Sequence, residues 1–400
     1  MQVNLRRVWR RLTFFVFVML VIEFTDEVAY SALEAARPLI RDAFALNYVQ
    51  VGLITSLPVG VAILVEPIFG LFGDGSRRRV FIVGGAALFG LGLIVQGLAP
   101  TFVVFLLGAT LQAPASGVFV NLAQASLMDD APDRRENRMA LWTASGSLAV
   151  VVGPLLLAGA LSLQLDWRAV FVAIGVLALG VALLAARLPN SPALRSATDT
   201  DDTEDDARLS VRDVLRLLRR LDIWRWLVLL QFSDLMLDVL FSLLALYLVD
   251  VAGVNEGRAA VAVALWTGVG LIGDLALIPL LERVRGLVYL RFSAGITLLL
   301  YPAFLMVSPL WGKLVLLGLL GLFNAGWYAV LQSKVYDALG EQSGAVLIVG
   351  NAAGVIGVTL PLVLGWIAVQ YGLSVAMWTL LAGPIALLIG LPRSVTALRE

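Results

Sequence analysis

The chain has 400 residues, of which 60% are hydrophobic and only 14% are charged, and its formal net charge at pH 7 is +0. A soluble domain usually contains about 25% charged residues, so this composition excludes a soluble globular protein and predicts an integral membrane protein. The sequence contains no Cys and no His. Disulfides, thiol catalysis, imidazole proton relays and His- or Cys-ligated metals are therefore excluded.

Long apolar segments recur along the whole chain, separated by short charged loops. Each segment is near the length of about 20 residues that a helix needs to cross a bilayer, and none shows the short alternating pattern of an outer-membrane barrel. We therefore expect an all-α membrane protein with twelve transmembrane helices. The predicted spans are 13–36, 47–72, 80–98, 101–127, 139–163, 168–187, 224–250, 258–281, 287–306, 310–333, 343–370 and 373–392.

Arginine clusters indicate the orientation of these spans. Clusters precede span one and lie between spans two and three, four and five, and eight and nine, all on one side of the membrane if there are twelve spans. Because basic residues accumulate in cytoplasmic loops, both termini are expected in the cytoplasm. The expected location is a cell membrane, as a multi-pass protein of the bacterial inner membrane.

A polar linker divides the predicted spans into two sets of six. We expect an N-terminal six-helix bundle at 1–189, a cytoplasmic linker at 190–222 and a C-terminal six-helix bundle at 223–400. The linker begins with an acidic run, and its later part alternates Val and Leu with Arg. That pattern predicts an amphipathic helix lying on the membrane surface.

Span one carries acidic residues where lipid would be expected. Glu23, Asp26, Glu27, Tyr30 and Glu34 follow one another at helical spacings and so share one helix face. A charge at the bilayer centre costs on the order of 2.5–3.5 kcal/mol on insertion scales. The face is therefore expected to line a water-filled cavity, to be protonated or to meet a cation.

A weak internal repeat relates the two halves. Adding 208 to a position in the first half places Glu23 on Gln231, Asp26 on Asp234 and Tyr30 on Asp238. The repeat preserves orientation, as expected for two pseudo-symmetric six-helix bundles related by an axis along the membrane normal. Such parallel repeats are typical of secondary transporters that bind substrate between the halves.

The loop between spans two and three resembles a signature of the major facilitator superfamily. Gly70, Asp74, Arg78 and Arg79 match the family pattern, whereas Gly75 and Arg77 exchange the expected basic residue and glycine. The resemblance implies that this loop latches one conformation during alternating access. A glycine pattern in span five, including Gly146 and Gly153-Pro154, partly resembles that of proton antiporters; close helix packing explains it equally well.

In the family that the chain resembles, spans one, four, seven and ten line the central cavity. We therefore expect proton or cation coupling at Glu23, Asp26, Glu27, Asp234 and Asp238. The expected substrate-cavity residues are Tyr30, Gln112, Ser116, Gln124, Gln231, Asn324, Trp327, Tyr328 and Gln332. Glu34 is expected to form an ion pair with Arg37 or Arg41, and Glu66 and Asp274 to act as structural caps or latch partners.

The charge in the predicted cavity is entirely acidic, which disfavours an anionic substrate. Burial and mutual repulsion favour protonation of such carboxyls, as a proton carrier requires. We therefore expect a secondary active transporter, working by proton-coupled export (antiport) of hydrophobic or cationic small molecules. The alternatives are a cation or divalent-metal transporter, a lysolipid transporter of the same fold and a non-transporting membrane receptor.

Catalytic motifs are missing from the sequence. It has no nucleotide-binding loop, no Gly-x-Ser-x-Gly and no His-Glu-x-x-His, so an enzyme is not expected. We expect no cofactor and no resident metal, with the proton gradient as the energy source. The expected partners are a cationic or amphipathic small molecule and the lipid bilayer, with no nucleic acid, and the protein is expected to be a monomer.

Overall fold

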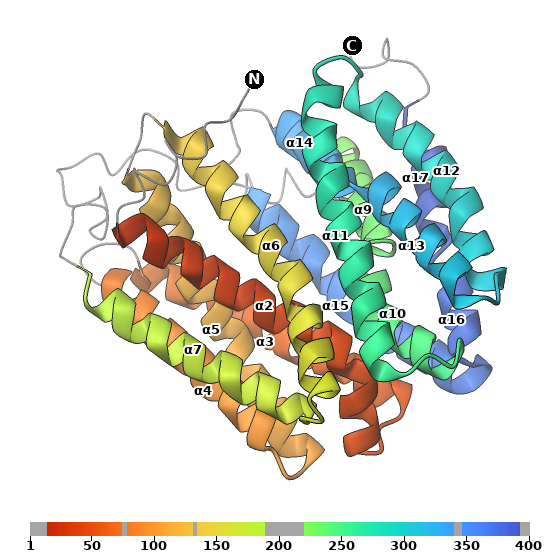
Figure 1. Ribbon diagram of the computed structural model, residues 1–400. Coiled ribbons are helices and arrows are strands. Elements are labelled where there is room, and N and C mark those ends of the chain that lie inside the picture. The colour runs from red at the N-terminus through yellow and green to blue at the C-terminus, as the bar shows by residue number, and fades with distance from the viewer. Residues whose placement is uncertain (1–13, 74–77, 131–133, 189–219, 340–345, 393–400) are drawn as a thin grey trace. The chain divides into compact units, whose positions relative to one another are not determined.

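Helices make up nearly all of the structure. The computed structural model describes residues 14–73, 78–130, 134–188, 220–339 and 346–392, and in these residues the only regular elements are helices (Figure 1). The first half contains α2 (Phe14–Ala43), α3 (Tyr48–Gly73), α4 (Arg78–Leu98), α5 (Phe102–Asp129), α6 (Arg135–Ser162) and α7 (Trp167–Ala186).

The second half has more helices because several predicted spans are interrupted. It contains α9 (Leu221–Asp234), α10 (Asp238–Asp250), α11 (Glu256–Leu281), α12 (Gly286–Met306), α13 (Leu310–Asn324), α14 (Trp327–Leu339), α15 (Val346–Tyr371), α16 (Leu373–Thr379) and α17 (Ala382–Gly390). Every predicted span thus coincides with one helix or with two consecutive helices. Residues 189–219, where the amphipathic linker helix was predicted, lie outside the described residues.

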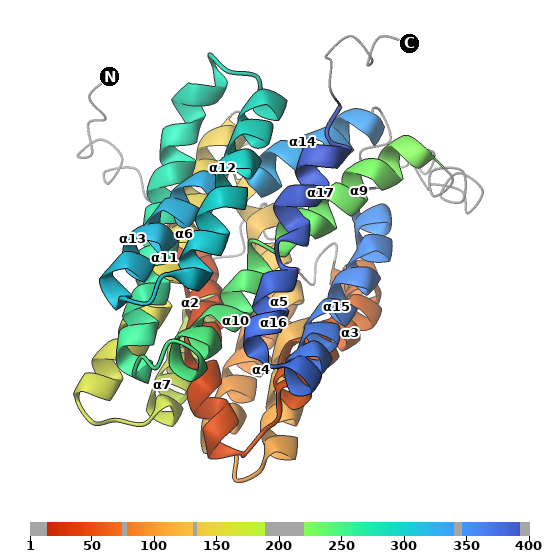
Figure 2. The ribbon, with the colours of Figure 1, turned by 90° about the vertical axis from the view of Figure 1, so that its right-hand side faces the viewer.

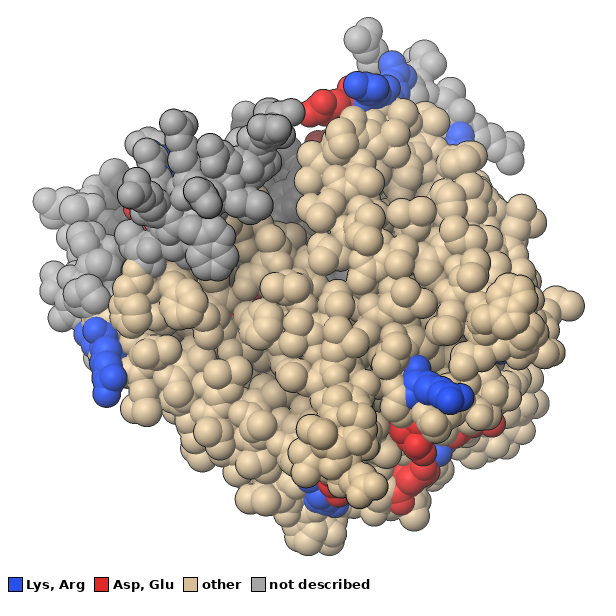
Figure 3. Space-filling model, in the orientation of Figure 1, with Lys and Arg blue, Asp and Glu red and all other residues tan. Residues whose placement is uncertain are grey.

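Ten segments of the described chain are long and apolar enough to cross a membrane. Three of them contain a pair of consecutive helices, namely Ile223–Asp250, Leu310–Val335 and Leu373–Gly390. The face in Figure 3 has wide areas without charged side chains, and the described Lys, Arg, Asp and Glu gather in a few small patches. The chain is therefore a multi-pass membrane protein, as the composition predicted.

Residues far apart in sequence form two compact units. Unit 1 comprises residues 1–33 and 57–203, and unit 2 comprises residues 34–56 and 204–400. The second part of α2 and the first part of α3 thus belong to the same unit as the C-terminal helices. The first part of α3 packs on α15 within unit 2, since a Cβ added to Gly365 of α15 would lie 2.4 Å from the Tyr48 carbonyl oxygen (Figure 2).

Glycines allow close packing of the helices in unit 1. A Cβ added to Gly92 of α4 would lie 2.9 Å from the Gly108 carbonyl oxygen of α5, and one added to Gly90 would lie 2.7 Å from the Gly175 carbonyl of α7. These contacts bring α4 against both α5 and α7 (Figure 1). Since lipid offers no hydrophobic driving force between helices, close backbone packing of this kind stabilises the bundle.

Candidate functional site

The acidic face of α2 contacts α5 inside unit 1. The Ser116 hydroxyl of α5 donates a hydrogen bond of 2.6 Å to the Asp26 carboxylate. Asp26 and Glu27 are half-buried and Glu23 is buried. The structure therefore brings together two of the residues predicted for the site, Asp26 and Ser116, and places three carboxyls on two consecutive turns of one helix.

Gly146 of α6 provides the space that Glu23 occupies. A Cβ on Gly146 would lie 2.6 Å from the Glu23 carboxylate oxygen. A residue larger than glycine would therefore displace the carboxyl group. Gly153 lies about two helical turns further along α6. It packs directly on α2, because an added Cβ would lie 2.7 Å from the Val28 carbonyl oxygen. In α6, the helix of predicted span five, Gly153 allows close packing on α2 and Gly146 leaves room for the Glu23 carboxyl.

Glu66 of α3 is a carboxyl whose position sequence reasoning did not predict. Its carboxylate rests on Gly117 of α5, where an added Cβ would lie 1.9 Å from Oε1. Gly117 directly follows Ser116, the partner of Asp26, so carboxyls from α2 and α3 reach the same turn of α5. The signal in the sequence was an acidic residue within an apolar segment, which in membrane proteins indicates a functional position.

The other site residues predicted in the first half lie in different environments. Gln112 accepts a hydrogen bond of 2.6 Å from the buried Gln96 of α4, and thus takes part in the packing of α4 on α5. Gln124 donates to the Met139 sulfur at 3.7 Å. Tyr30 is half-buried on α2.

In unit 2, Asp234 and Asp238 flank an interruption between two helices. Asp234 is the last residue of α9 and Asp238 is the first of α10. Asp238 is exposed and Asp234 is half-buried. Gln231, three residues earlier, packs against Gly357 of α15, where an added Cβ would lie 2.8 Å from the Gln231 side-chain oxygen. The predicted alignment with α2 is therefore only approximate, because α2 is continuous where this segment is broken.

The environments of Asn324 and Trp327 differ from the cavity position predicted for them. Asn324 is 2% exposed and Trp327 is 0% exposed. The Asn324 amide donates to the Met236 carbonyl at 3.1 Å, and the Trp327 indole donates to Ser293 at 2.8 Å. Both side chains are therefore buried among helices of unit 2, and each has a hydrogen-bonding partner there. Tyr328, by contrast, is 54% exposed and Gln332 is half-buried.

The loop signature is described only in part. Gly70 lies within α3, while Asp74 lies outside the described residues. Arg78 forms an ion pair with Asp129 at 2.7 Å, and Arg79 donates to the Ala186 carbonyl. These contacts join the first turn of α4 to the last residues of α5 and α7, so both arginines bind helix C-termini, where positive charge is favourable.

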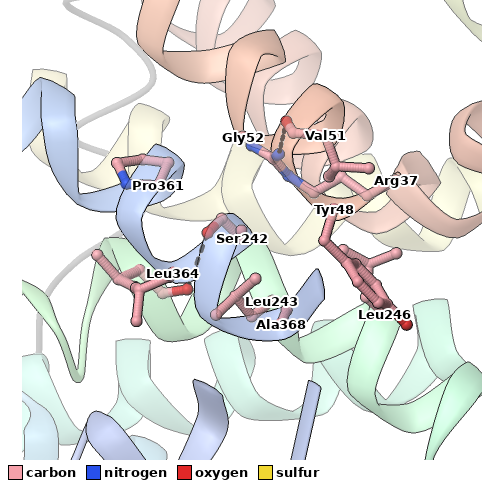
Figure 4. A pocket seen from close by; sticks show the side chains of 12 residues that line it. Arg37, Tyr48, Val51, Gly52, Ser242, Leu243, Leu246, Pro361, Leu364 and Ala368 are labelled. Carbon is pink, nitrogen blue, oxygen red and sulfur yellow. Dashed lines mark hydrogen bonds between the residues drawn. The ribbon is translucent and has the colours of Figure 1, made fainter. Parts of the chain in front are cut away.

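A polar cluster joins the end of α2 to the start of α3 in unit 2. Arg37 donates to the Glu34 carboxylate at 2.6 Å and to the Thr55 hydroxyl at 2.5 Å. The ion pair predicted for Glu34 is confirmed, with Arg37 as its partner. Figure 4 shows Arg37 at a pocket with residues of α3, α10 and α15, among them Gly52, Ser242 and Pro361.

A second polar cluster connects the end of α2 and the start of α3 to α10. Asp250, the last residue of α10, accepts hydrogen bonds from Arg41 and, at 2.7 Å, from the Tyr48 hydroxyl. Nearby, Gly52 of α3 packs on α15, since its Cβ would lie 2.5 Å from the Pro361 carbonyl oxygen. Ionic contacts and backbone packing together hold the α2–α3 connection against the C-terminal helices of unit 2.

The described residues contain no group of three or more His, Cys, Asp or Glu side chains placed to hold a metal ion. The acids of α2, α3, α9 and α10 are instead arranged singly or in sequence-adjacent sets on helices. Such carboxyls can take up and release protons or bind an organic cation through charge.

Comparisons with known proteins agree with this architecture. A family model described as Major Facilitator Superfamily matches residues 16–358. The Escherichia coli multidrug resistance protein MdtL is 25% identical over 323 residues, covering 78% of this chain and 77% of MdtL. The Pseudomonas aeruginosa protein OpdE, named a transcription regulatory protein, is 25% identical over 296 residues, covering 72% of this chain and 70% of OpdE.

Solved structures show the same fold at lower sequence identity. A bacterial homolog of the human lysosomal transporter Spinster, in an inward-facing and unoccupied conformation, superposes with a TM-score of 0.71 at 17% identity and 94% coverage of both chains. The nucleoside transporter NupG superposes with a TM-score of 0.72 at 11% identity, covering 94% of this chain and 98% of NupG.

Proposed function

The chain belongs to the Major Facilitator Superfamily, and we propose that it exports hydrophobic or cationic small molecules in exchange for protons. The observation that carries this proposal is the acidic face of α2, with Asp26 bonded to Ser116 and Glu23 seated against Gly146. Helix α5 contains no Lys or Arg, and α2 contains none before Arg37. The carboxyls on this face are therefore suited to binding protons or cations.

The proposed exchange uses competition for the same carboxyls. A buried carboxyl is more stable protonated than charged, so a proton binds readily when no other cation is present. A cationic substrate that approaches Asp26 favours the charged form and releases the proton. Unit 2 contains a second pair of carboxyls that could bind protons in the same way, the exposed Asp238 and the half-buried Asp234.

One of the two relatives, MdtL, supports an export function. MdtL is named a multidrug resistance protein and aligns with most of this chain. Its name suggests a substrate class of several unrelated compounds, which an acidic cavity would select by charge and hydrophobicity. The expected location is a bacterial inner membrane, with both termini in the cytoplasm.

Alternating access also requires that contacts at one end of the protein separate. The contacts of Asp250 with Arg41 and Tyr48 join the connection between α2 and α3 to the end of α10. We propose that these contacts close the extracytoplasmic end and break when the protein opens there. The loop residues Arg78 and Arg79 stabilise helix ends at the opposite, cytoplasmic end.

The proposal can be tested in proteoliposomes that contain a pH-sensitive dye. Ethidium, Mn²⁺ and a lysolipid are added in turn, with protein-free liposomes as the control. Proton movement driven by ethidium supports the proposed function. Proton movement driven only by Mn²⁺ or only by the lysolipid would replace it with a metal or lysolipid transporter, and no movement with any of the three would favour a receptor.

A further inference from the structure

Two membrane helices of unit 2 are interrupted at positions that contact each other. The first interruption, residues 235–237, separates α9 from α10, and the second, residues 325–326, separates α13 from α14. Inside a membrane every backbone amide and carbonyl group needs a partner, so an interrupted helix persists only where other groups replace its lost hydrogen bonds. These two interruptions have such replacements.

At the first interruption, the carbonyl group of Met236 loses its helical partner. In a regular helix it would accept from the Leu240 amide. The Leu240 amide donates instead to the Leu235 carbonyl at 3.2 Å, and the Met236 amide donates to the Ser233 carbonyl at 2.9 Å. The Met236 carbonyl is thereby released from the helix, and the Asn324 side chain donates to it at 3.1 Å.

At the second interruption, side chains from neighbouring helices satisfy the backbone. Gly326 has a φ of +72°, and its amide donates to the Asp274 carboxylate of α11 at 2.9 Å. The Tyr289 hydroxyl of α12 donates to the Ala325 carbonyl at 2.9 Å. The positive φ favours glycine at 326, and an added Cβ there would also have to displace the Leu277 side chain. This interruption is therefore fixed independently of the first.

Asn324, the last residue of α13, connects the two interruptions. Its amide nitrogen binds the Met236 carbonyl, and its oxygen accepts a hydrogen bond of 2.9 Å from the Thr297 hydroxyl of α12. The side chain is almost fully buried, so water does not compete for either bond. The released Met236 carbonyl is thus bonded to a side chain that directly precedes the second interruption and that is also bonded to α12.

We propose that Asn324 is a positioning residue that fixes the turn between Asp234 and Asp238 and couples it to the interruption in the span of α13 and α14. This proposal rests on the proposed role of the two aspartates in proton exchange. Asp234 and Asp238 stand at the two ends of the turn, so the spacing of their carboxyls follows from its conformation. Without the Asn324 side-chain amide, the turn would be less ordered, and proton movement would no longer be coupled to substrate movement.

Hydrogen exchange of the full-length protein in lipid nanodiscs tests the coupling without requiring transport. In Asn324→Leu, the amides of residues 236–240 should exchange about fivefold faster than in the wild type, the ratio expected for the loss of one net hydrogen bond. Asn324→Ala, which adds no bulk, should show the same increase if the leucine variant fails to fold. Thr297→Val is the matched control, because it removes the other hydrogen bond of Asn324 and leaves the Met236 bond in place.

Ethidium-driven proton movement provides the second measurement. Asn324→Leu should move fewer protons per ethidium than Thr297→Val. Unchanged exchange in both Asn324 variants would overturn the proposal, as would faster exchange with unchanged proton coupling. If the wild-type protein moves no protons at all, the proposed function fails, and the exchange result still decides whether Asn324 holds the turn.

Discussion

The buried ion pair between Glu34 and Arg37 allows a quantitative prediction about stability. Its side chains are 1% and 2% exposed, respectively, and the guanidinium also donates to Thr55 at 2.5 Å. Glu34→Gln keeps the size of the side chain but removes its charge. Because the buried Arg37 guanidinium then loses the charged carboxylate of Glu34, the variant should lose about 3–5 kcal/mol of unfolding free energy.

A double variant separates the cost of breaking the Glu34–Arg37 ion pair from the net contribution of the pair to stability. Replacing a buried ion pair with uncharged residues of similar volume is often close to neutral. Glu34→Gln combined with Arg37→Met should therefore recover most of the loss seen in Glu34→Gln. Unfolding by SDS in mixed micelles, followed by fluorescence of the 10 tryptophans, measures the free energies of all variants.

Asp42→Asn is the matched control for this series. Asp42 pairs with Arg41 at 2.7 Å, but its side chain is 56% exposed. An exposed pair contributes about 0–1 kcal/mol, so this variant should unfold almost like the wild type. A loss of less than about 1 kcal/mol in Glu34→Gln would show that the pair contributes no more than an exposed one. Simple addition of the effects of Glu34→Gln and Arg37→Met would show that the two side chains are not coupled.

Two further predictions concern the acids of unit 1 and the contacts of α10. Gly117→Ala should displace the Glu66 carboxyl and reduce ethidium-driven proton movement. Gly84→Ala is the control, because an added Cβ at Gly84 meets open space and should leave proton movement unchanged. Equal proton movement in the two variants would exclude Glu66 from the site. Leu246 lines the pocket that also contains Arg37. Asp250→Asn should increase maleimide labelling of Leu246→Cys by up to about fivefold, the ratio expected for the loss of an ion pair. The chain has no cysteine of its own, so unchanged labelling would show that these contacts do not close the pocket.

Composition and hydropathy predicted most of the fold. Each apolar segment of about 20 residues became a helix or two consecutive helices, and prolines such as Pro38, Pro114 and Pro361 remained inside helices. Proline is tolerated in membrane helices because neighbouring helices and side chains satisfy the freed backbone groups. The apolar length of a segment was therefore a better guide than its helix-breaking residues.

The helix interruptions could be predicted only in part. The interruption after α13 contains Gly326, which has a positive φ. Glycine in the sequence is a signal for such a position, because it adopts positive φ without strain. The interruption after α9 contains Leu235, Met236 and Leu237, three residues compatible with a helix. Its cause is tertiary, because the Asn324 amide stabilises the released Met236 carbonyl from a position 88 residues away.

The candidate site was predictable for its charges and less so for its contacts. The helical spacing of Glu23, Asp26 and Glu27 identified the acidic face, and the partnership of Asp26 with Ser116 joins two residues that were both predicted. The position of Glu66 against Gly117 depends on how α3 packs on α5. Asp250 was missed for the same kind of reason, since Arg41, its partner, is 209 residues distant in sequence.

If the carboxyls of Asp26 and Asp234 exchange protons for substrate, neutralising either one should stop proton release into dye-loaded proteoliposomes. Wild-type protein, Asp26→Asn and Asp234→Asn are compared after addition of ethidium, at equal protein content. We expect proton movement with the wild type and its loss in both variants. Full proton movement in both asparagine variants would show that neither carboxyl is needed for the exchange.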